Sequence, residues 1–276
     1  MAIFSKAGIV GTGLVGGSLG LALKKNKLAD QVVGTSRHAS SVSAAKKIRA
    51  IDAGSQDINI LKGCDLVILA GPVETILGQM GRISRLVTDD CIVIDVASTK
   101  ELVVKKANKC FARFVGCHPL AGSDKRGIAF ARPDLFNKAA CIITPVRSTD
   151  KAALTLIMNM WVKLGSDIIT LDPGAHDRIL AWMSHLPHAM AFALISAVPD
   201  RYLAYAPQSF RDMTRIAGSS PDIWEDVFTT NRRNLLDSID VFVRQLIKVR
   251  SRIMQNDRRG LSRLLKAAQN KKHRSI

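Results

Sequence analysis

A histidine stands where an apolar run of the chain ends. In GCHPLAGSDKRG (residues 116–127), His118 follows the run ARFVGC and precedes Pro119 and a charged loop. Core histidines usually lie inside an apolar periodic pattern, and this one does not. An imidazole at such a position can accept a proton from a substrate hydroxyl, which is worth roughly 10²–10⁴-fold in rate. The alternative is a histidine that only caps the end of a strand.

A glycine pattern near the N-terminus indicates a second kind of chemistry. Within GIVGTGLVGGSLGLAL, an apolar run leads directly into Gly11, Thr12, Gly13, Leu14, Val15 and Gly16. In a strand–turn–helix unit the first glycine permits a tight turn and the second lets the backbone approach a pyrophosphate. The third lets helix and strand pack closely. The phosphates then meet free N–H groups at the helix start. The pattern predicts dinucleotide binding, with a plain glycine-rich turn as the alternative.

The residues about 20 positions further on bear on the choice of dinucleotide. An Asp or Glu there would bond the 2′-hydroxyl of the adenosine ribose and repel a 2′-phosphate. The chain instead has GTSRHASS at residues 34–41, without an acid. Because Ser36 and Arg37 could hold a phosphate, we expect NADP to be favoured over NAD. The alternative is a solvated Arg37 in an enzyme that uses NAD or both.

Two further turns belong to the same edge of the predicted sheet. Gly71 and Pro72 follow the run DLVILA, and Ser98, in DVASTK, follows the run CIVIDV. Ligands of such sheets bind beyond the carboxyl ends of the strands. We therefore expect Gly71 and Pro72 beside the cofactor, and Ser98 close to His118.

The elements that must position these residues alternate in type through the first half of the chain. The expected strands cover residues 7–11, 31–36, 65–70, 91–96, 113–117 and 141–145, with helical stretches between several of them. Several strands are apolar throughout, which is typical of a parallel sheet buried on both faces. The alternation predicts an α/β, doubly wound, Rossmann-type dinucleotide-binding domain.

The second half of the chain has helical periodicity. Asp172 and Ser220 are each followed by a proline, as in a helix N-cap with Pro at the first helical position. The expected helices cover residues 173–198, 208–217, 221–230, 232–255 and 257–270. We expect a dinucleotide-binding domain at 1–168 and an all-α dimerisation and substrate domain at 169–276. Apolar spacing such as LLDSIDVFVRQLIKV predicts a homodimer interface.

Composition limits the class of protein. With 47% hydrophobic residues the chain can bury a large core, and it has neither a cleavable signal nor a run of 18 apolar residues. Its five cysteines form no CxxC pair, which is typical of reduced thiols in a cytoplasmic protein without a membrane span.

The net charge of +17 is concentrated near the C-terminus, where residues 232–276 hold 13 Lys/Arg and three Asp. This excess has three interpretations: a solvated basic surface, attraction of small anions, or binding of a polyanion. Nucleic acid is the least favoured partner, because aromatic residues are scarce and no nucleic-acid-binding motif is present.

Two histidines of the second half lie on one helix face. His185 and His188 are three residues apart, but no third ligand is evident nearby, so we expect no metal site. We expect His185 to be structural or to orient its neighbour, and Pro187 to bend the helix. His176 and Asp177, near the expected helix start, are equally compatible with ordinary first-turn chemistry, and no site role is assigned to them.

Several motifs together carry a resemblance to a known family. GCHPLAGSDKRG, with DVASTK, HDRILAWMSHLPHAMAFAL and RDMTRIAGSSPDIW, resembles the prephenate/arogenate dehydrogenase family of tyrosine biosynthesis, from the glycine motif to about residue 250. The resemblance implies an NAD(P)-dependent oxidoreductase acting on a CH–CH group, in which a nucleotide-binding domain precedes a helical dimerisation domain. Its reaction would be oxidative decarboxylation of prephenate to 4-hydroxyphenylpyruvate, or of arogenate to tyrosine.

The resemblance also implies roles for individual residues. His118 matches the histidine that bonds the ring hydroxyl and helps remove its proton, and Ser98 the serine that contacts the same hydroxyl. Arg215, in TRIAG, matches an arginine that binds a substrate carboxylate, and His188 matches another substrate-site residue. Prephenate carries two carboxylates, for which a bidentate arginine is a natural partner. Many members have Glu at the position of Asp124, whose role stays open.

Two alternatives remain from the sequence. One is another two-domain dehydrogenase, of the β-hydroxyacid type, whose chemistry usually depends on a lysine in the helical domain. The other is a non-catalytic protein that binds the cofactor or nucleic acid, which the basic C-terminal region motivates. The presence of Ser98, His118 and Arg215 disfavours the second alternative, because a sensor needs no proton acceptor.

Overall fold

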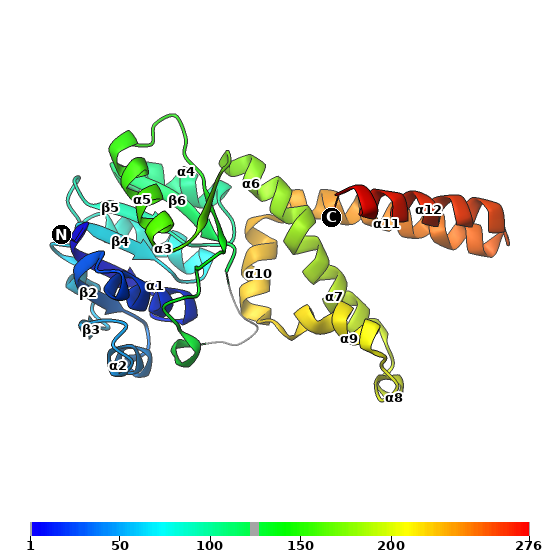
Figure 1. Cartoon of the computed structure of the whole chain (residues 1–276), viewed down its shortest axis with the longest axis horizontal. Helices are drawn as coiled ribbons and strands as arrows, with labels where there is room; N and C mark the ends of the chain where they lie inside the picture. Colours follow the sequence, from blue (N-terminus) through cyan, green and yellow to red (C-terminus); the bar gives the residue numbers. More distant parts are fainter. Residues whose placement is uncertain (1, 122–126, 276) are drawn as a thin grey trace.

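The computed structural model describes residues 2–121 and 127–275. Asp124 lies outside the described residues. The chain forms an α/β part followed by a helical part, and the last two long helices extend away from the rest of the molecule (Figure 1). This arrangement confirms the predicted fold class.

The α/β part is built on one sheet of eight strands in the order β3-β2-β1-β4-β5-β6-β7-β8. The strands are β1 (Phe4–Val10), β2 (Ala29–Thr35), β3 (Ala53–Ser55), β4 (Leu66–Leu69), β5 (Ile92–Asp95), β6 (Arg113–Pro119), β7 (Ala140–Ile143) and β8 (Asp167–Thr170). The pairs among the first six strands are parallel, in the order typical of dinucleotide-binding domains, whereas β7 is antiparallel to β6. The chain order reverses between β1 and β4, where such sheets bind their ligands.

Helices cover both faces of this sheet. They are α1 (Leu14–Lys25), α2 (Ala39–Lys47), α3 (Val73–Ile83), α4 (Glu101–Cys110) and α5 (Lys151–Lys163), with short 3₁₀ segments at Ile58–Leu61 and Ile128–Phe130. Successive strand residues point to opposite faces. Ile68 of β4 accordingly packs in the cluster of α1 and α5, whereas Val67 and Leu69 pack in the cluster of α3 and α4. An apolar layer therefore packs on each face of the sheet and fixes the position of its carboxyl edge.

The helical part continues directly from β8. Its elements are α6 (Pro173–Leu180), a π-helical segment (Ala181–His185), α7 (Leu186–Ala197), α8 (Asp200–Leu203), α9 (Gln208–Thr214), a 3₁₀ segment (Arg215–Gly218), α10 (Pro221–Thr230), α11 (Arg232–Met254) and α12 (Arg258–Ser275). Both predicted caps are confirmed: Asp172 accepts from the N–H groups of Gly174 and Ala175, and Ser220 accepts from that of Ile223.

The structure differs from the sequence-based expectation in several elements. β3 has only three small residues, and β8 is a largely exposed edge strand, so neither has the apolar run by which the other strands were predicted. The predicted division between residues 168 and 169 falls inside β8. α12 also extends to Ser275, beyond the predicted end at 270.

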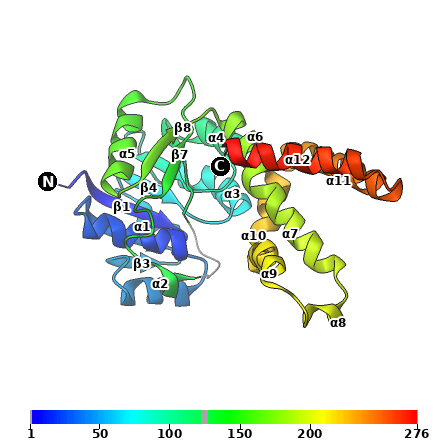
Figure 2. The same ribbon diagram turned by 45° about the vertical axis from the view of Figure 1, so that its right-hand side comes forward.

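The helical part meets the α/β part through α6 and α10, which lie beside the starts of α4 and α3 (Figure 2). By length and composition alone, the stretch Pro173–Ala197 could cross a membrane. Its buried polar residues His176, Asp177 and His185 bond instead to the α/β part and to the start of α11. This stretch therefore serves as the connection between the two parts.

Candidate active site

The glycine loop between β1 and α1 has the geometry that its spacing predicts. Gly11 has φ +99°, and a Cβ there would lie 2.9 Å from the carbonyl of Ala70. A Cβ on Gly16 would collide with the carbonyl oxygen of Gly11, whereas a Cβ on Gly13 would meet nothing within 4 Å. The first and third glycines are therefore required by packing. Gly13 faces open space that a pyrophosphate can occupy.

The other residues of the loop contribute in different ways. Leu14 and Val15 begin α1 and pack against the apolar core. Thr12 is buried with its methyl group toward Gly34 of β2, and its hydroxyl has no hydrogen-bond partner within the described parts of the chain. These side chains shape the loop, and its backbone N–H groups are left for a ligand.

A cavity of about 470 Å³ opens beside the glycine loop. Its lining comprises Val10, Gly11, Thr35, Ser36, Arg37, His38, Gln56, Ile58, Gly71, Pro72, Thr75, Ile76, Gln79 and Arg82. The predicted cofactor residues Ser36, Arg37, Gly71 and Pro72 are thus brought together with Gly11. The lining contains arginine but no carboxylate.

Arg37 is held in place by its neighbours. Its Nε and Nη2 lie 3.3 Å from His38 Nε2, and Gln56 Nε2 donates to the Arg37 carbonyl at 2.7 Å. The guanidinium is exposed at the rim of the cavity. Arg82, which the sequence did not point to, lines the same cavity from α3.

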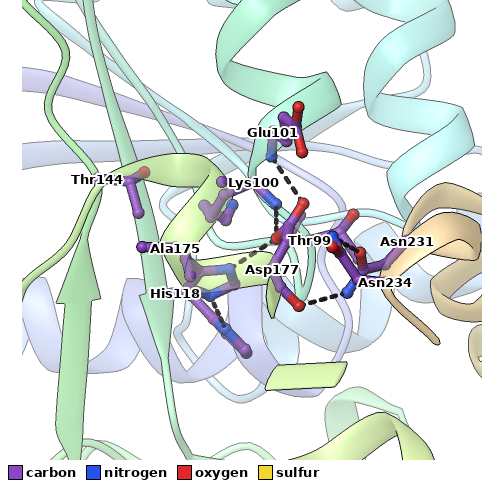
Figure 3. A network of polar contacts seen from close by, with 12 residues as sticks. Thr99, Lys100, Glu101, His118, Thr144, Ala175, Asp177, Asn231 and Asn234 are labelled. Carbon is purple, nitrogen blue, oxygen red and sulfur yellow. Dashed lines mark hydrogen bonds and ion pairs between the residues drawn. The ribbon is translucent and has the colours of Figure 1, made fainter. Parts of the chain in front are cut away.

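His118 lies near the end of β6, only 9% exposed, and is bonded to a second histidine. Its Nδ1 is 2.8 Å from Nε2 of His176 in α6, and His176 Nδ1 is 2.7 Å from Oδ1 of Asp177 (Figure 3). Asp177 also accepts from the backbone N–H groups of Lys100 at 2.8 Å and Glu101 at 2.9 Å. A carboxylate and two imidazoles therefore form one chain of hydrogen bonds across the two parts of the molecule.

This chain of bonds determines which nitrogen of His118 can act as a base. An ionised Asp177 only accepts, so His176 donates from Nδ1 and its Nε2 is an acceptor. His118 must then donate from Nδ1, which leaves a lone pair on its own Nε2. The arrangement prepares His118 Nε2 to accept a proton.

The surroundings also keep these imidazoles neutral. Burial holds the pKa of His118 well below its ordinary value, and His176, the Lys100 ammonium and His185 lower it further. Burial likewise lowers the pKa of His176, although the hydrogen bond that His176 donates to Asp177 acts in the opposite direction. His118 is therefore unprotonated at neutral pH, as a general base must be.

A buried ion pair lies beneath the same edge. Lys100 and Asp95 form a salt bridge with both side chains fully buried. Asp95 also accepts from the N–H groups of Ala97, at 2.9 Å, and Cys117, at 3.3 Å, which ties the end of β5 to the residue before His118. Ser98 is half-buried in the turn that Asp95 shapes. Since β5 and β6 are paired in register, Ser98 and His118 lie at the same edge of the sheet.

The second histidine pair lies at an irregularity of its helix. The π-helical segment Ala181–His185 precedes Pro187, and His188 donates from Nδ1 to the Ser184 carbonyl at 2.9 Å. π-bulges of this kind are frequent at functional sites. The predicted bend at Pro187 is thus a local widening of the helix that turns His188 toward α10.

His188 and Arg215 are near one another. The His188 ring stacks on Trp224 of α10 with centroids 3.5 Å apart. Burial lowers the pKa of His188, and the positive charge of Arg215, exposed at the start of its 3₁₀ segment, lowers it further. Burial lowers the pKa of His185 to about 4, and its Nδ1 is 3.1 Å from Asn231 Nδ2. Asn231 Nδ2 also donates to the Asp177 carbonyl at 2.7 Å, so Asn231 connects His185 to the residues that hold His118.

Sequence reasoning missed several residues of this arrangement. His176 and Asp177 were set aside as first-turn residues, yet they connect His118 to the helical part. Lys100 and Asp226 were also not identified. A signal was present for Lys100, because it lies between the apolar runs CIVI and LVV, and a lysine buried there needs a partner.

Comparisons with known proteins agree with this arrangement. The family profile of the prephenate dehydrogenase nucleotide-binding domain matches residues 19–170, and that of the prephenate dehydrogenase dimerization domain matches residues 172–267. The second match confirms the predicted homodimer. Together the two profiles cover most of the chain.

Individual relatives match along nearly the whole chain. Prephenate dehydrogenase of Bacillus subtilis is 34% identical over 271 residues, covering 94% of this chain and 73% of the relative. A prephenate dehydrogenase from A. aeolicus, solved with hydroxyphenyl propionate and NAD+, has a TM-score of 0.92 at 31% identity, covering 99% of this chain and 98% of that one. Synechocystis arogenate dehydrogenase has a TM-score of 0.83 at 30% identity, with 98% and 100% covered. The chain belongs to the prephenate dehydrogenase family.

Proposed function

We propose that the protein decarboxylates prephenate or arogenate oxidatively, with His118 as the general base, and that it favours NADP over NAD. The observation that carries the proposal is His118 itself. Its Nδ1 is bound to the His176–Asp177 pair, its Nε2 has a lone pair, and it lies at the sheet edge where the glycine loop opens. The alternative β-hydroxyacid chemistry is not favoured.

The residues of the first turn fit a dinucleotide. Gly13 leaves open space before the start of α1, and α1 begins with no side-chain cap and no acid in its first turn. Gly11, Gly13 and Gly16 would hold the pyrophosphate, and Gly71 and Pro72 would line the adjoining wall. The bound nicotinamide supplies the hydride acceptor.

The chain's own residues bring about the proton loss that accompanies oxidation. His118 Nε2 takes the proton of the ring hydroxyl, and Ser98 bonds the same oxygen. As the hydroxyl carbon gives up its hydride, the ring carboxylate leaves as CO₂, the electron pair of the broken carbon–carbon bond enters the ring, and the phenolate so formed takes the proton back from His118. Because aromatisation drives the carbon–carbon cleavage, the protein mainly has to orient the substrate and relieve it of one proton.

The helical part would hold the substrate's charged groups. The Arg215 guanidinium can bind one carboxylate in a bidentate manner. His188, near Arg215 and supported by the Trp224 ring, offers Nε2 to a second polar group. His188 is half-buried, which strengthens its hydrogen bonds, whereas Arg215 is exposed and free to meet a carboxylate.

The preference for NADP rests on charge. The cavity lining holds Ser36 and Arg37 after β2, and Arg82 from α3. α2 begins at His38 with no side-chain cap and no acid in its first turn, so its positive end is open to an anion. A 2′-phosphate would gain these contacts, whereas NAD would leave them unused.

The domain boundary and the cellular location complete the proposal. A boundary after Thr170 keeps β8 whole in the nucleotide-binding domain and leaves α6 to the helical domain. All five cysteines are free, and four of them are buried, which agrees with a reducing, cytoplasmic location.

The test is steady-state reduction of NAD and NADP, with prephenate and L-arogenate each supplied as substrate. We expect turnover with at least one pair, and a higher kcat/KM for NADP than for NAD. His118→Asn should lower kcat by about 10²–10⁴-fold. Arg37→Leu should raise the KM for NADP and leave that for NAD nearly unchanged.

Each part of the proposal can fail separately. Absence of turnover in all four combinations from a folded dimer would contradict the activity. Equal KM values of the Arg37→Leu variant and the wild type for NADP would contradict the cofactor preference alone. Full kcat in His118→Asn would contradict the assignment of the base.

A further inference from the structure

Four helices of the α/β part begin at the carboxyl edge of the sheet, and their starts differ. α1 and α2 have neither a side-chain cap nor an acid in the first turn. α3 and α4 have Glu74 and Glu101 in the first turn, while their own N-cap residues, Pro72 and Lys100, provide no side-chain cap. An uncapped helix start exposes N–H groups without intrahelical partners and carries about half a positive charge.

The helical part supplies the caps that α3 and α4 lack. Asp226 of α10 accepts from the N–H of Val73 through Oδ2 and from that of Glu74, at 3.0 Å, through Oδ1. Asp177 of α6 does the same for α4. Figures 1 and 2 both show α10 beside α3. Asp226 is only 9% exposed, and it belongs to neither the hydrogen-bond chain of His118 nor the cavity lining.

The cap of α3 acts on the wall of the cofactor cavity. The first turn of α3 follows Gly71 and Pro72 without a break, and both line the cavity. The preceding backbone is packed tightly on the glycine loop: a Cβ on Gly11 would lie 2.9 Å from the Ala70 carbonyl and 3.0 Å from the Gly71 nitrogen. A shift at the start of α3 would therefore move this wall relative to Gly11.

We propose that Asp226 is a positioning residue for the cofactor. From the helical part it caps α3, holds Gly71 and Pro72 against the glycine loop, and neutralises the positive end of α3. The phosphates of the dinucleotide are thereby directed to the open starts of α1 and α2. This inference rests on the proposed placement of the cofactor at the glycine loop.

The test compares three variants of full-length protein. Asp226→Ala removes both acceptors, and Asp226→Asn keeps one carbonyl oxygen. The matched control Glu225→Ala removes an exposed carboxylate from the preceding position of the same helix. Fluorescence titration gives the Kd for NADPH and NADH, steady-state kinetics give KM and kcat, and thermal unfolding without cofactor gives the midpoint.

We expect Asp226→Ala to raise the Kd and KM for the cofactor by about 3- to 30-fold, the range of a lost helix cap. Its kcat at saturating cofactor should stay within about twofold of the wild type. Asp226→Asn should lie between Asp226→Ala and the wild type, and Glu225→Ala should match the wild type. If Asp226→Ala does not fold, the Asp226→Asn values decide.

Two results would overturn the inference in different ways. A lowered unfolding midpoint with an unchanged Kd in Asp226→Asn would mean that the cap serves stability alone. A wild-type protein that binds neither NADPH nor NADH would overturn the placement of the cofactor, and the proposed function with it.

Discussion

At the scale of single residues, the site depends on the hydrogen bonds that fix the proton positions on His118 and His176. Asp177 accepts from His176 and from two backbone N–H groups at the start of α4, so both of its carboxylate oxygens are engaged. The proton positions on His176 and His118 follow from that one carboxylate. If His118 is the base, as we propose, it is prepared before substrate arrives, which avoids reorganisation during the reaction.

This dependence makes His176 a testable residue. His176→Leu removes the only acceptor for His118 Nδ1 among the described residues, while the bonds of Asp177 to Lys100 and Glu101 remain. We expect kcat to fall at least about tenfold, because the tautomer of His118 is no longer fixed. The KM for the cofactor should be unchanged. Steady-state kinetics check this, with a variant of the exposed His273, His273→Leu, as control. A wild-type kcat in His176→Leu would show that the hydrogen bond from His118 to His176 is not needed for catalysis.

At the scale of elements, helices α1 and α3 differ in the space that they leave for a side chain at a glycine position. Gly16 faces the carbonyl of Gly11, whereas Gly78 of α3 faces open space. The same chemical change should therefore have opposite effects in two helices that flank the same sheet.

Replacing each glycine by alanine tests this difference. Gly16→Ala should lower the free energy of unfolding by about 1–3 kcal/mol, because the backbone must shift, and should weaken NADPH binding. Gly78→Ala should raise the free energy of unfolding by about 0.5–1 kcal/mol, since alanine is the better helix former. Urea unfolding and NADPH titration give both quantities. Equal stability of the two variants would contradict the tight packing at Gly16.

How far the sequence predicted these elements depended on whether the determinants are local. The Rossmann-type order, the sheet edge with His118 and Ser98, and the two proline-initiated helices all follow from local patterns. β3 and β8 have too little apolar surface for a pattern, and the antiparallel direction of β7 does not show in composition. The absence of a capping residue before α3 was visible, but its partner Asp226 lies 153 positions away. Contacts of that kind come from tertiary packing alone.

At the scale of the whole molecule, the pKa values of four histidines of the site are lowered, one in the α/β part and three in the helical part. Burial is the main cause for His118, His176, His185 and His188. Each is neutral in the folded protein at a pH where the unfolded chain is already protonated. Stability is therefore complete above about pH 6.5 and is lost as the pH falls toward the folded-state values.

The protein should accordingly become less stable in mild acid. Between pH 6.5 and 4, His185 alone, with its pKa lowered to about 4, accounts for a loss of up to roughly 3 kcal/mol. Urea unfolding at intervals from pH 7.5 to 4.5 measures the loss, and a His185→Leu variant should show a shallower decline. A free energy of unfolding that is constant over this range would contradict the neutral, buried state of these residues.

The caps supplied by Asp177 and Asp226 also govern the order in which the molecule can be made. All eight strands have left the ribosome once Thr170 has, but Asp226 is synthesised 153 residues after Val73. At 5–20 residues per second those 153 residues take roughly 8–30 s, and the last 56 of them, from Thr170 to Asp226, take roughly 3–11 s. Over that interval a nascent chain has its complete sheet, while water alone satisfies the N–H groups at the start of α3. The cofactor wall takes its final form only when most of the chain has been translated.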